Sequence, residues 1–245
     1  MARRLGLFGF GAFGRLAVRS LAPYFDVVVH DPSARAQAQA RRWNVTLASL
    51  EETAACPFVV LGAPVGELAA LAQAVAPHVK PGAVVLDVAS VKVGPAKWMS
   101  GALPDYVDIV GTHPLFGPQS ARDGLTGLEI VVCPVRSERV DRTTRFLART
   151  LALKVSVTTP EAHDRALAAV QGLTHMIAKV MSGLEPLPRV HTTVSYERMM
   201  QALSLVQGDS DDLFLAIERE NPYAADLRQR FFAEIEALRG RLENP

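Results

Sequence analysis

Short apolar runs alternate with amphipathic stretches over the first two thirds of the chain. The runs expected to be strands are Leu5–Phe10, Phe25–His30, Phe58–Ala63, Val84–Val88, Val107–Gly111 and Glu129–Cys133. The stretches expected to be helices are Phe13–Leu21, Ala34–Trp43, Ser49–Ala54 and Glu67–Val75. Strands that alternate with helices indicate βαβ units, and continuous apolar strands suit a sheet covered on both faces. The pattern predicts an α/β fold with a doubly wound, mostly parallel sheet.

The pattern changes after about residue 153. A last strand is expected at Lys154–Thr158, and Thr159-Pro160-Glu161 then carries the signals of a helix start. A long helical pattern continues to Gly183, and further helices are expected at Val194–Gln207 and Asp211–Gly240, the latter with a potential break at Asn221-Pro222. We therefore expect a first domain over residues 1–155 and an all-helical domain over 156–245. The helical tail is too small and apolar to stand alone, so it should pack against a second subunit in a homodimer.

Composition narrows the class of protein. The 245 residues are 49% hydrophobic, which is enough for a substantial core. Because 26 basic side chains face 25 acidic ones, for a net charge of +1, no long-range field favours nucleic acid or an anionic membrane. No apolar stretch is long enough to cross a bilayer. Glycines interrupt the apolar run at the N-terminus, so it is not expected to be a signal peptide. Two cysteines give neither a disulfide framework nor a metal pair, so a cytoplasmic protein is expected.

A glycine-rich turn follows the first strand. Gly9-Phe10-Gly11-Ala12-Phe13-Gly14 matches the G-x-G-x-x-G pattern of dinucleotide-binding folds. The glycines allow a tight turn, close approach of a pyrophosphate and close packing of helix on strand, and the helix from Ala12 points its free N–H groups at phosphates. A ligand-free glycine turn is the alternative, but the position between strand and helix favours cofactor binding.

Asp31 ends the second strand, about 20 residues after the turn, where an acid accepts hydrogen bonds from the adenosine ribose. Such an acid repels a 2′-phosphate, so NAD is preferred. NADP remains open, because Ser33 and Arg35 could accommodate a phosphate and Asp31 could simply cap the next helix. Ala63 and Pro64, after the third strand, are expected to line the same cofactor cleft or to form an ordinary connection.

Polar residues at two further strand ends are candidates for chemistry. Ser90 and Lys92 follow the fourth strand and could hold a polar substrate or the nicotinamide, although a surface serine and lysine are usually without function. His113 lies in Gly111-Thr112-His113-Pro114-Leu115-Phe116-Gly117-Pro118, expected to be a stiff loop after a strand. Histidine suits proton transfer near neutral pH, but a lone loop histidine is as often an exposed turn residue.

The long helix carries Gln171 and His175 on one face, since they are four residues apart. They could line a pocket or be satisfied polar groups of a core helix. His113, His163 and His175 lack the spacing and the acid or thiol partners of a zinc site, so no metal is expected.

Together these segments resemble the prephenate/arogenate dehydrogenase family over nearly the whole chain. The matching pieces, in order, are Gly9-x-Gly11-x-x-Gly14, Asp87-x-x-Ser90-x-Lys92, Gly111-Thr112-His113-Pro114-Leu115-Phe116-Gly117-Pro118, His163-Asp164 and Gln171-x-Leu173-x-His175. The tail, with Gly208-Asp209-Ser210-x-Asp212-Leu213, is most similar to arogenate dehydrogenases. The His-Pro-x-Phe-Gly-Pro element is specific, whereas many dehydrogenases share the glycine motif.

The resemblance implies a Rossmann-type domain followed by a helical dimerisation domain, and an NAD(P)-dependent oxidative decarboxylation of a cyclohexadienol, prephenate or arogenate. It implies that His113 takes the ring hydroxyl proton as hydride leaves, that Ser90 assists, and that Gln171 and His175 line the substrate pocket.

One departure concerns the substrate. Prephenate-specific members usually carry an arginine in the helical region, but residues 199–207 contain none, which favours arogenate. Arg198, Arg122 and Arg165 are alternative partners for a substrate carboxylate. The competing hypotheses are a β-hydroxyacid dehydrogenase or imine reductase with the same architecture, and a non-enzymatic dinucleotide-binding module.

Overall fold

The computed structural model describes residues 3–184, 186–188 and 190–243. The chain forms two compact units, one ending at His163 and the other beginning at Asp164. Within the described residues, no helix is long and apolar enough to cross a membrane.

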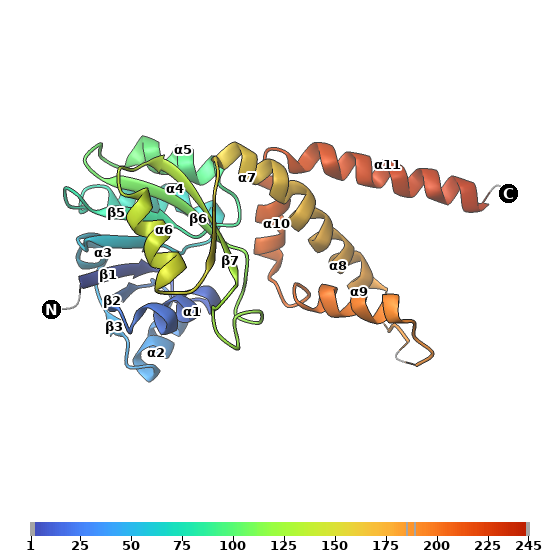
Figure 1. Cartoon of the computed structure of the whole chain (residues 1–245), viewed down its shortest axis with the longest axis horizontal. Coiled ribbons are helices and arrows are strands. Elements are labelled where there is room, and N and C mark those ends of the chain that lie inside the picture. The colour runs from blue at the N-terminus through green and yellow to red at the C-terminus, as the bar shows by residue number, and fades with distance from the viewer. Residues whose placement is uncertain (1–2, 185, 189, 244–245) are drawn as a thin grey trace. The chain divides into compact units, whose positions relative to one another are not determined.

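The first unit is built on a sheet of eight strands over the described part of the chain, in the order β3-β2-β1-β4-β5-β6-β7-β8 (Figure 1). The strands are β1 (Arg3–Phe8), β2 (Phe25–His30), β3 (Thr46–Leu47), β4 (Phe58–Leu61), β5 (Val84–Asp87), β6 (Asp108–Pro114), β7 (Glu129–Arg136) and β8 (Lys154–Val157). All neighbours pair in parallel except β6 and β7, which are antiparallel. The predicted doubly wound, mostly parallel sheet is thus confirmed.

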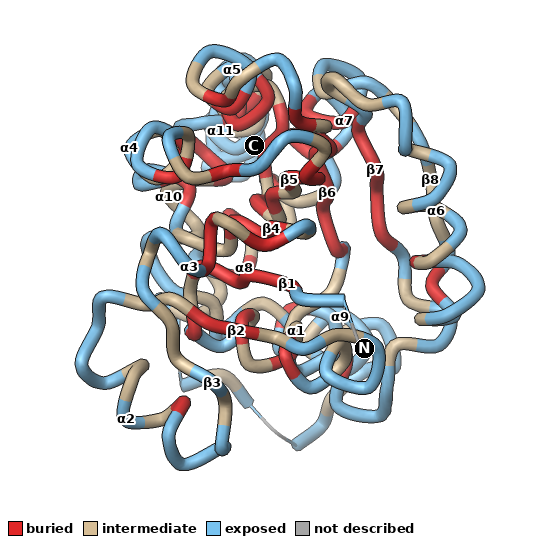
Figure 2. Tube along the Cα trace, turned by 90° about the vertical axis from the view of Figure 1, so that its left-hand side faces the viewer, coloured by how far each residue is buried: buried red, intermediate tan, exposed pale blue. Residues whose placement is uncertain are grey.

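Helices cover both faces of this sheet. They are α1 (Ala12–Leu21), α2 (Ala34–Arg42), α3 (Leu50–Ala54), the 3₁₀ turn η1 (Val65–Glu67), α4 (Leu68–Val75), α5 (Val93–Ala102) and α6 (Val140–Arg149). Buried side chains of α3, α4 and α5 form one apolar cluster with the central strands, and those of α1 and α2 form a second. Leu147 of α6 joins a third cluster with β7. Figure 2 shows many of the buried residues on the central strands, as expected for a sheet covered on both sides.

The second unit is helical. Its elements, counting the helix that leads into it, are α7 (Pro160–Leu167), the π-helical segment η2 (Ala168–Leu173), α8 (Thr174–Gly183), α9 (Val194–Ser204), α10 (Asp211–Arg219) and α11 (Ala224–Glu243). The helix start expected at Thr159 is present, since its hydroxyl accepts a hydrogen bond from the Ala162 amide at 3.2 Å. The break between α10 and α11 falls at Asn221-Pro222, as the sequence indicated.

Some elements differ from the sequence-based expectation. Strand β3 and helices α5 and α6 were not expected. The strand expected to end at Gly111 continues to Pro114, so the prediction that His113 lies in a loop is wrong. The extension has a physical cause: β7 returns antiparallel beside β6, and His113 pairs with Val131 and Pro114 with Ile130.

Candidate active site

The glycine turn joins β1 to α1 and has the geometry of a phosphate cradle. Gly9 has a φ of +94°, and a Cβ at Gly14 would lie 2.2 Å from the Gly9 carbonyl oxygen. A Cβ at Gly11, in contrast, would meet no atom within 4 Å, and no side chain caps the N-terminus of α1. Two glycines therefore serve the fold, whereas the space at Gly11 fits a phosphate group approaching the helix N-terminus.

The other expected cofactor residues surround this turn. Ala12 is exposed at the first position of α1, whereas Phe13 is half-buried and lines an apolar cavity, so its contact with a cofactor stays a prediction. The turn also approaches the loop after β4, because a Cβ at Gly9 would lie 2.6 Å from the Gly62 carbonyl oxygen and 3.5 Å from the Ala63 nitrogen. Pro64 follows in that loop and is exposed.

Asp31 ties two loops together at the end of β2. One carboxylate oxygen accepts a hydrogen bond from the Phe10 amide at 2.7 Å, and the other accepts from the Ser33 amide at 2.8 Å. Each oxygen keeps lone pairs for a further donor such as a ribose hydroxyl. Ser33 caps α2 through its hydroxyl, as Ala36 donates to it at 3.4 Å. The arrangement fits the adenosine half of a dinucleotide, and the role of Asp31 towards the ribose stays a prediction.

A buried polar cluster lies where β5 and β6 end. Asp87, Lys92, His113 and His163 are each at most 4% exposed. Asp87 and Lys92 form an ion pair, and Asp87 also accepts a hydrogen bond from the Ala89 amide at 2.9 Å. The ion pair packs against Gly111 of β6, where an added Cβ would lie 3.2 Å from the Lys92 side chain. A glycine at this position therefore leaves room for the buried ion pair.

His113 contacts His163 directly. Nδ1 of His113 lies 2.9 Å from Nε2 of His163, and the ring centroids are 5.1 Å apart. Burial lowers the pKa of His113 well below its usual value, and the nearby His163 and Lys92 lower it further. Burial raises the pKa of Asp87, and the Lys92 ammonium opposes that effect. His113 is consequently a neutral imidazole at physiological pH, the state that a proton acceptor needs.

Two predicted residues lie beside this cluster in different ways. Ser90 is half-buried between β5 and α5, and its assistance to His113 or to a substrate hydroxyl stays a prediction. Lys92, which the sequence suggested could lie at the surface, is 1% exposed and bonded to Asp87. Its ammonium acts first as the partner of a buried carboxylate, and direct contact with substrate stays a prediction.

Gln171 and His175 belong to the second unit. They stand one turn apart, in η2 and α8, and Nδ1 of His175 lies 2.9 Å from the Gln171 carbonyl oxygen. Nε2 of His175 lies 3.1 Å from the Asp209 carboxylate. Single-turn π segments occur frequently at functional sites. Substrate binding by this pair stays a prediction.

Among the alternative cations, Arg165 stacks over the Tyr223 ring, 4.4 Å from its centroid. Arg122 pairs with neighbouring Asp123 at the surface, and Arg198 is exposed. No group of three metal-ligating side chains comes together among the described residues.

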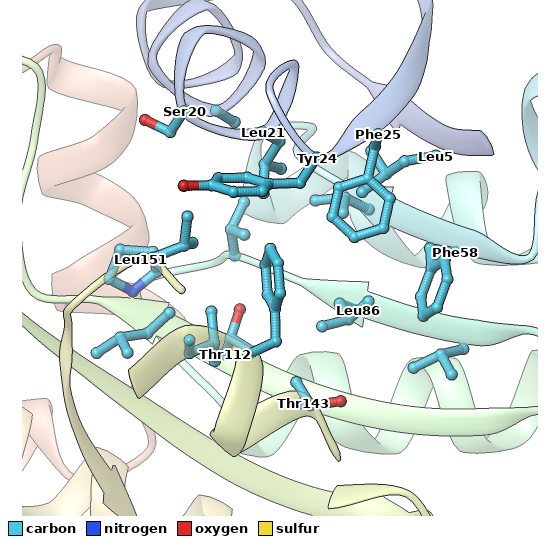
Figure 3. Close-up of a pocket in the computed structure, with 18 of the residues that line it drawn as sticks. Leu5, Ser20, Leu21, Tyr24, Phe25, Phe58, Leu86, Thr112, Thr143 and Leu151 are labelled. Atoms are coloured by element: carbon cyan, nitrogen blue, oxygen red, sulfur yellow. The ribbon is translucent and has the colours of Figure 1, made fainter. Parts of the chain in front are cut away.

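A large apolar cavity of about 740 Å³ lies elsewhere in the first unit, on the sheet face between α1 and α6 (Figure 3). Its walls include Leu21, Phe58 and Leu86, and Thr112 faces it from β6. Because strand side chains alternate between faces, Thr112 and Pro114 line this cavity while His113 points away from it. Its lining residues offer no acid–base pair, so the candidate chemistry lies at the strand ends and not in this cavity.

Two members of the polar cluster, Asp87 and His163, were not predicted from the sequence as site residues. Asp87 was noted only within the resembling motif, as the end of an apolar strand, although an acid ending a strand next to a lysine five residues on was a usable signal. The contact of His163 with His113 spans fifty residues of sequence, and only the sheet and the start of α7 create it.

Comparison with known proteins places the chain in a family. The profile described as the nucleotide-binding domain of prephenate dehydrogenase matches residues 15–155. The chain is 28% identical over 192 residues to a probable arogenate/prephenate dehydrogenase of Methanocaldococcus jannaschii, covering 74% of this chain and 42% of the relative. It is 31% identical over 172 residues to arogenate dehydrogenase 1 of Arabidopsis thaliana, covering 67% of this chain and 27% of the relative. The chain thus spans less than half the length of these two relatives.

Solved structures agree on the fold. Prephenate dehydrogenase of Aquifex aeolicus, solved with hydroxyphenyl propionate and NAD+, superposes with a TM-score of 0.78 at 17% identity, covering 99% of this chain and 91% of that one. Arogenate dehydrogenase of Synechocystis gives a TM-score of 0.70 at 19% identity, with coverages of 98% and 92%. From the profile match over more than half its length, the chain belongs to the prephenate dehydrogenase family and carries that family's nucleotide-binding domain.

Proposed function

We propose that the protein is an NAD-dependent dehydrogenase that oxidatively decarboxylates a cyclohexadienol, arogenate or prephenate, in tyrosine biosynthesis. The observation that carries the proposal is a buried, neutral His113 at the end of β6, in the same unit as a glycine turn open at Gly11. The relatives named as arogenate or prephenate dehydrogenases support the same reaction. The hydroxyacid dehydrogenase, imine reductase and non-enzymatic alternatives have no comparable support.

Cofactor binding would use the turn and the two loops beside it. Backbone N–H groups of the first turn of α1 would hold the pyrophosphate, with Gly11 leaving it room. Asp31 would accept hydrogen bonds from the ribose hydroxyls, and Ala63 and Pro64 would border the cleft. An aspartate here disfavours a 2′-phosphate, which supports NAD over NADP. The bound cofactor supplies the hydride acceptor.

The protein's own part in the chemistry is to orient the ring and to take a proton. Hydride loss from the carbinol carbon builds positive charge there, and removal of the hydroxyl proton by His113 relieves it. The C–O bond becomes a carbonyl, and the ring carboxylate then leaves as carbon dioxide. The electron pair of the broken C–C bond enters the ring, which becomes aromatic. The proton held by His113 returns to the resulting phenolate oxygen or passes to water.

Aromatisation makes the decarboxylation strongly favourable, so the site need not activate the leaving carboxylate. It must hold the ring carbon against the nicotinamide and polarise the hydroxyl. Ser90 would assist that hydroxyl, and Gln171, His175 and Lys92 would contribute to substrate binding. The lack of arginine over residues 199–207 favours arogenate, whose side chain is an amino acid, over prephenate.

The substitution His113→Asn tests this role directly. It should lower kcat by about 10²–10⁴-fold, the usual worth of a general base, while the NAD dissociation constant stays nearly unchanged. The measurements are NADH absorbance at saturating substrate and a nucleotide titration by fluorescence. A variant that keeps near-normal kcat would show that the base lies elsewhere, with His175 the next residue to replace.

The homodimer remains part of the proposal and is supported by α11. Phe231, Ile235, Leu238 and Leu242 recur at i, i+4, i+7 and i+11, so they share one face of that helix. The last three are 43–75% exposed. An apolar stripe of this kind is typical of helices that pair with a partner. We also propose a cytoplasmic location, consistent with two buried cysteines, Cys56 and Cys133, that form no disulfide in the described part of the chain.

A further inference from the structure

The contact between His113 and His163 limits which nitrogen of His113 can act as a base. Nδ1 of His113 and Nε2 of His163 are 2.9 Å apart, a hydrogen-bond distance, and the rings are 4% and 2% exposed. His163 is held by its own helix start, where its amide donates to the Thr159 carbonyl at 3.0 Å. The pair is therefore a fixed element of the first unit.

Each neutral imidazole has one N–H and one bare nitrogen, so only one of the two rings can donate across this contact. If His163 donates, the proton of His113 must sit on its Nε2, and His113 has no free nitrogen left for a substrate proton. If His113 donates from Nδ1, its Nε2 carries the lone pair. The direction of one hydrogen bond thus decides whether His113 can be a base at all.

We propose that His163 is a positioning residue, which accepts the Nδ1–H of His113 and thereby keeps Nε2 of His113 free to take the substrate's hydroxyl proton. The inference rests on the proposed function, because a base role for His113 is what selects this direction of the hydrogen bond. The tautomer itself can be measured without turnover. His163 plays the part that an acid plays beside the histidine of hydrolytic triads, where the partner likewise fixes tautomer and orientation.

The charges around the pair bear on why a histidine, and not a carboxylate, stands beside His113. Lys92, which is ion-paired with Asp87, adds positive charge near His113. Burial and the neighbouring Lys92 and His163 lower the pKa of His113, so its charged form is disfavoured at rest. A carboxylate in place of His163 would stabilise the imidazolium and make His113 a base already protonated. An imidazole nitrogen of His163 can accept the same hydrogen bond without adding a negative charge.

Three variants test the proposal. His163→Leu removes the acceptor, His163→Gln restores one, because its side-chain amide oxygen can reach the position of the imidazole Nε2, and His78→Leu is the matched control. His78 is a half-buried histidine between α4 and β5, outside the polar cluster. For each protein the measurements are kcat and KM from NADH formation, the NAD dissociation constant, and the His113 tautomer from long-range ¹H–¹⁵N spectra of ¹⁵N-histidine-labelled protein.

We expect wild-type His113 to carry its proton on Nδ1. His163→Leu should shift that proton towards Nε2 and lower kcat by about tenfold or more, but by less than loss of the base itself, with little change in KM or NAD affinity. His163→Gln should recover most of the wild-type kcat and the Nδ1–H tautomer, and His78→Leu should behave as wild type.

Several results would overturn the proposal. One is an Nε2–H tautomer of His113 in the wild type, and another is a His163→Leu variant with normal kcat. A third is a His163→Gln variant that binds NAD normally yet shows the tautomer and the kcat of His163→Leu. The tautomer is read without substrate, so a wild type that turns over no cyclohexadienol would refute the proposed function while the tautomer still decides the present inference.

Discussion

Two substitutions in the glycine turn should have different effects, one on the stability of the fold and the other on the affinity for the cofactor. In Gly14→Ala the new Cβ would lie 2.2 Å from the Gly9 carbonyl oxygen, against an ordinary contact of 3.4 Å or more. Helix α1 and the turn would have to move apart by about 1.2 Å, and because backbone cannot rotate away, the cost should reach the upper part of the 1–3 kcal/mol range for overpacking. In a chain of this length that corresponds to a loss of about 5–10 °C in Tm.

Gly11→Ala is the matched control for this effect. Its Cβ would meet no atom within 4 Å, and the φ of −67° suits alanine, so the loss of stability should stay within about 1 kcal/mol of an altered helix cap. The same Cβ would occupy the space proposed for the pyrophosphate, so the NAD dissociation constant should rise by about tenfold or more, or 1.4 kcal/mol.

Thermal unfolding without cofactor and NAD titration at a temperature where both variants are folded give the two readouts. The reasoning would be refuted by a Gly14→Ala protein as stable as wild type, since the close approach of helix and turn would then carry no cost. It would equally be refuted by a Gly11→Ala protein that binds NAD as wild type does.

Four further outcomes are expected. Wild-type protein should bind NAD at least about tenfold more tightly than NADP, and Asp31→Ser should narrow the gap; a wild type that prefers NADP contradicts the assignment. Lys92→Met leaves the Asp87 carboxylate buried without its ion-pair partner, so the free energy of unfolding measured in urea should fall by about 3–5 kcal/mol. Adding Asp87→Leu should restore much of that loss, and unchanged stability of Lys92→Met would contradict the prediction. Because the pKa of His113 in the substrate-free protein lies below its usual 6.5, kcat/KM should hold until the pH falls below about 6.5, and an acid limb centred above that value disagrees. Leu238→Asp should convert a dimer to a monomer in light scattering, whereas a monomeric wild type at micromolar concentration would remove the dimer proposal.

The alternation of apolar runs and amphipathic stretches was sufficient to predict every strand of the sheet except β3, and most of its helices. It did not predict α5, a helix of ten residues in which Gly94, Pro95 and Gly101 have low helix propensity, nor α6, whose sequence is largely polar. In both cases packing on the sheet outweighs weak local preference. The end of β6, beyond Gly111, was missed for a different reason. Its antiparallel partner β7 lies later in the chain, and the local sequence pattern does not reveal which strands pair.

The candidate site was predictable where chemistry follows from local sequence. The glycine turn, Asp31 and His113 stand out by motif and by position at strand ends. The burial of Lys92 against Asp87 depends on the space above Gly111, and the contact between His113 and His163 depends on how α7 begins after β8. Burial, and then such contacts between distant segments, lower the pKa of the candidate base, and only the folded chain reveals them.

The central claim is the reaction itself, and parallel turnover assays test it most directly. Purified protein would be given NAD+ with arogenate and, separately, with prephenate, while NADH is followed by absorbance and carbon dioxide and the phenolic product are quantified. The account predicts turnover of at least one of the two, with equal amounts of NADH, carbon dioxide and phenol, and loss of all three in His113→Asn. Failure to oxidise either substrate by protein that binds NAD, or NADH formation without carbon dioxide, would contradict it.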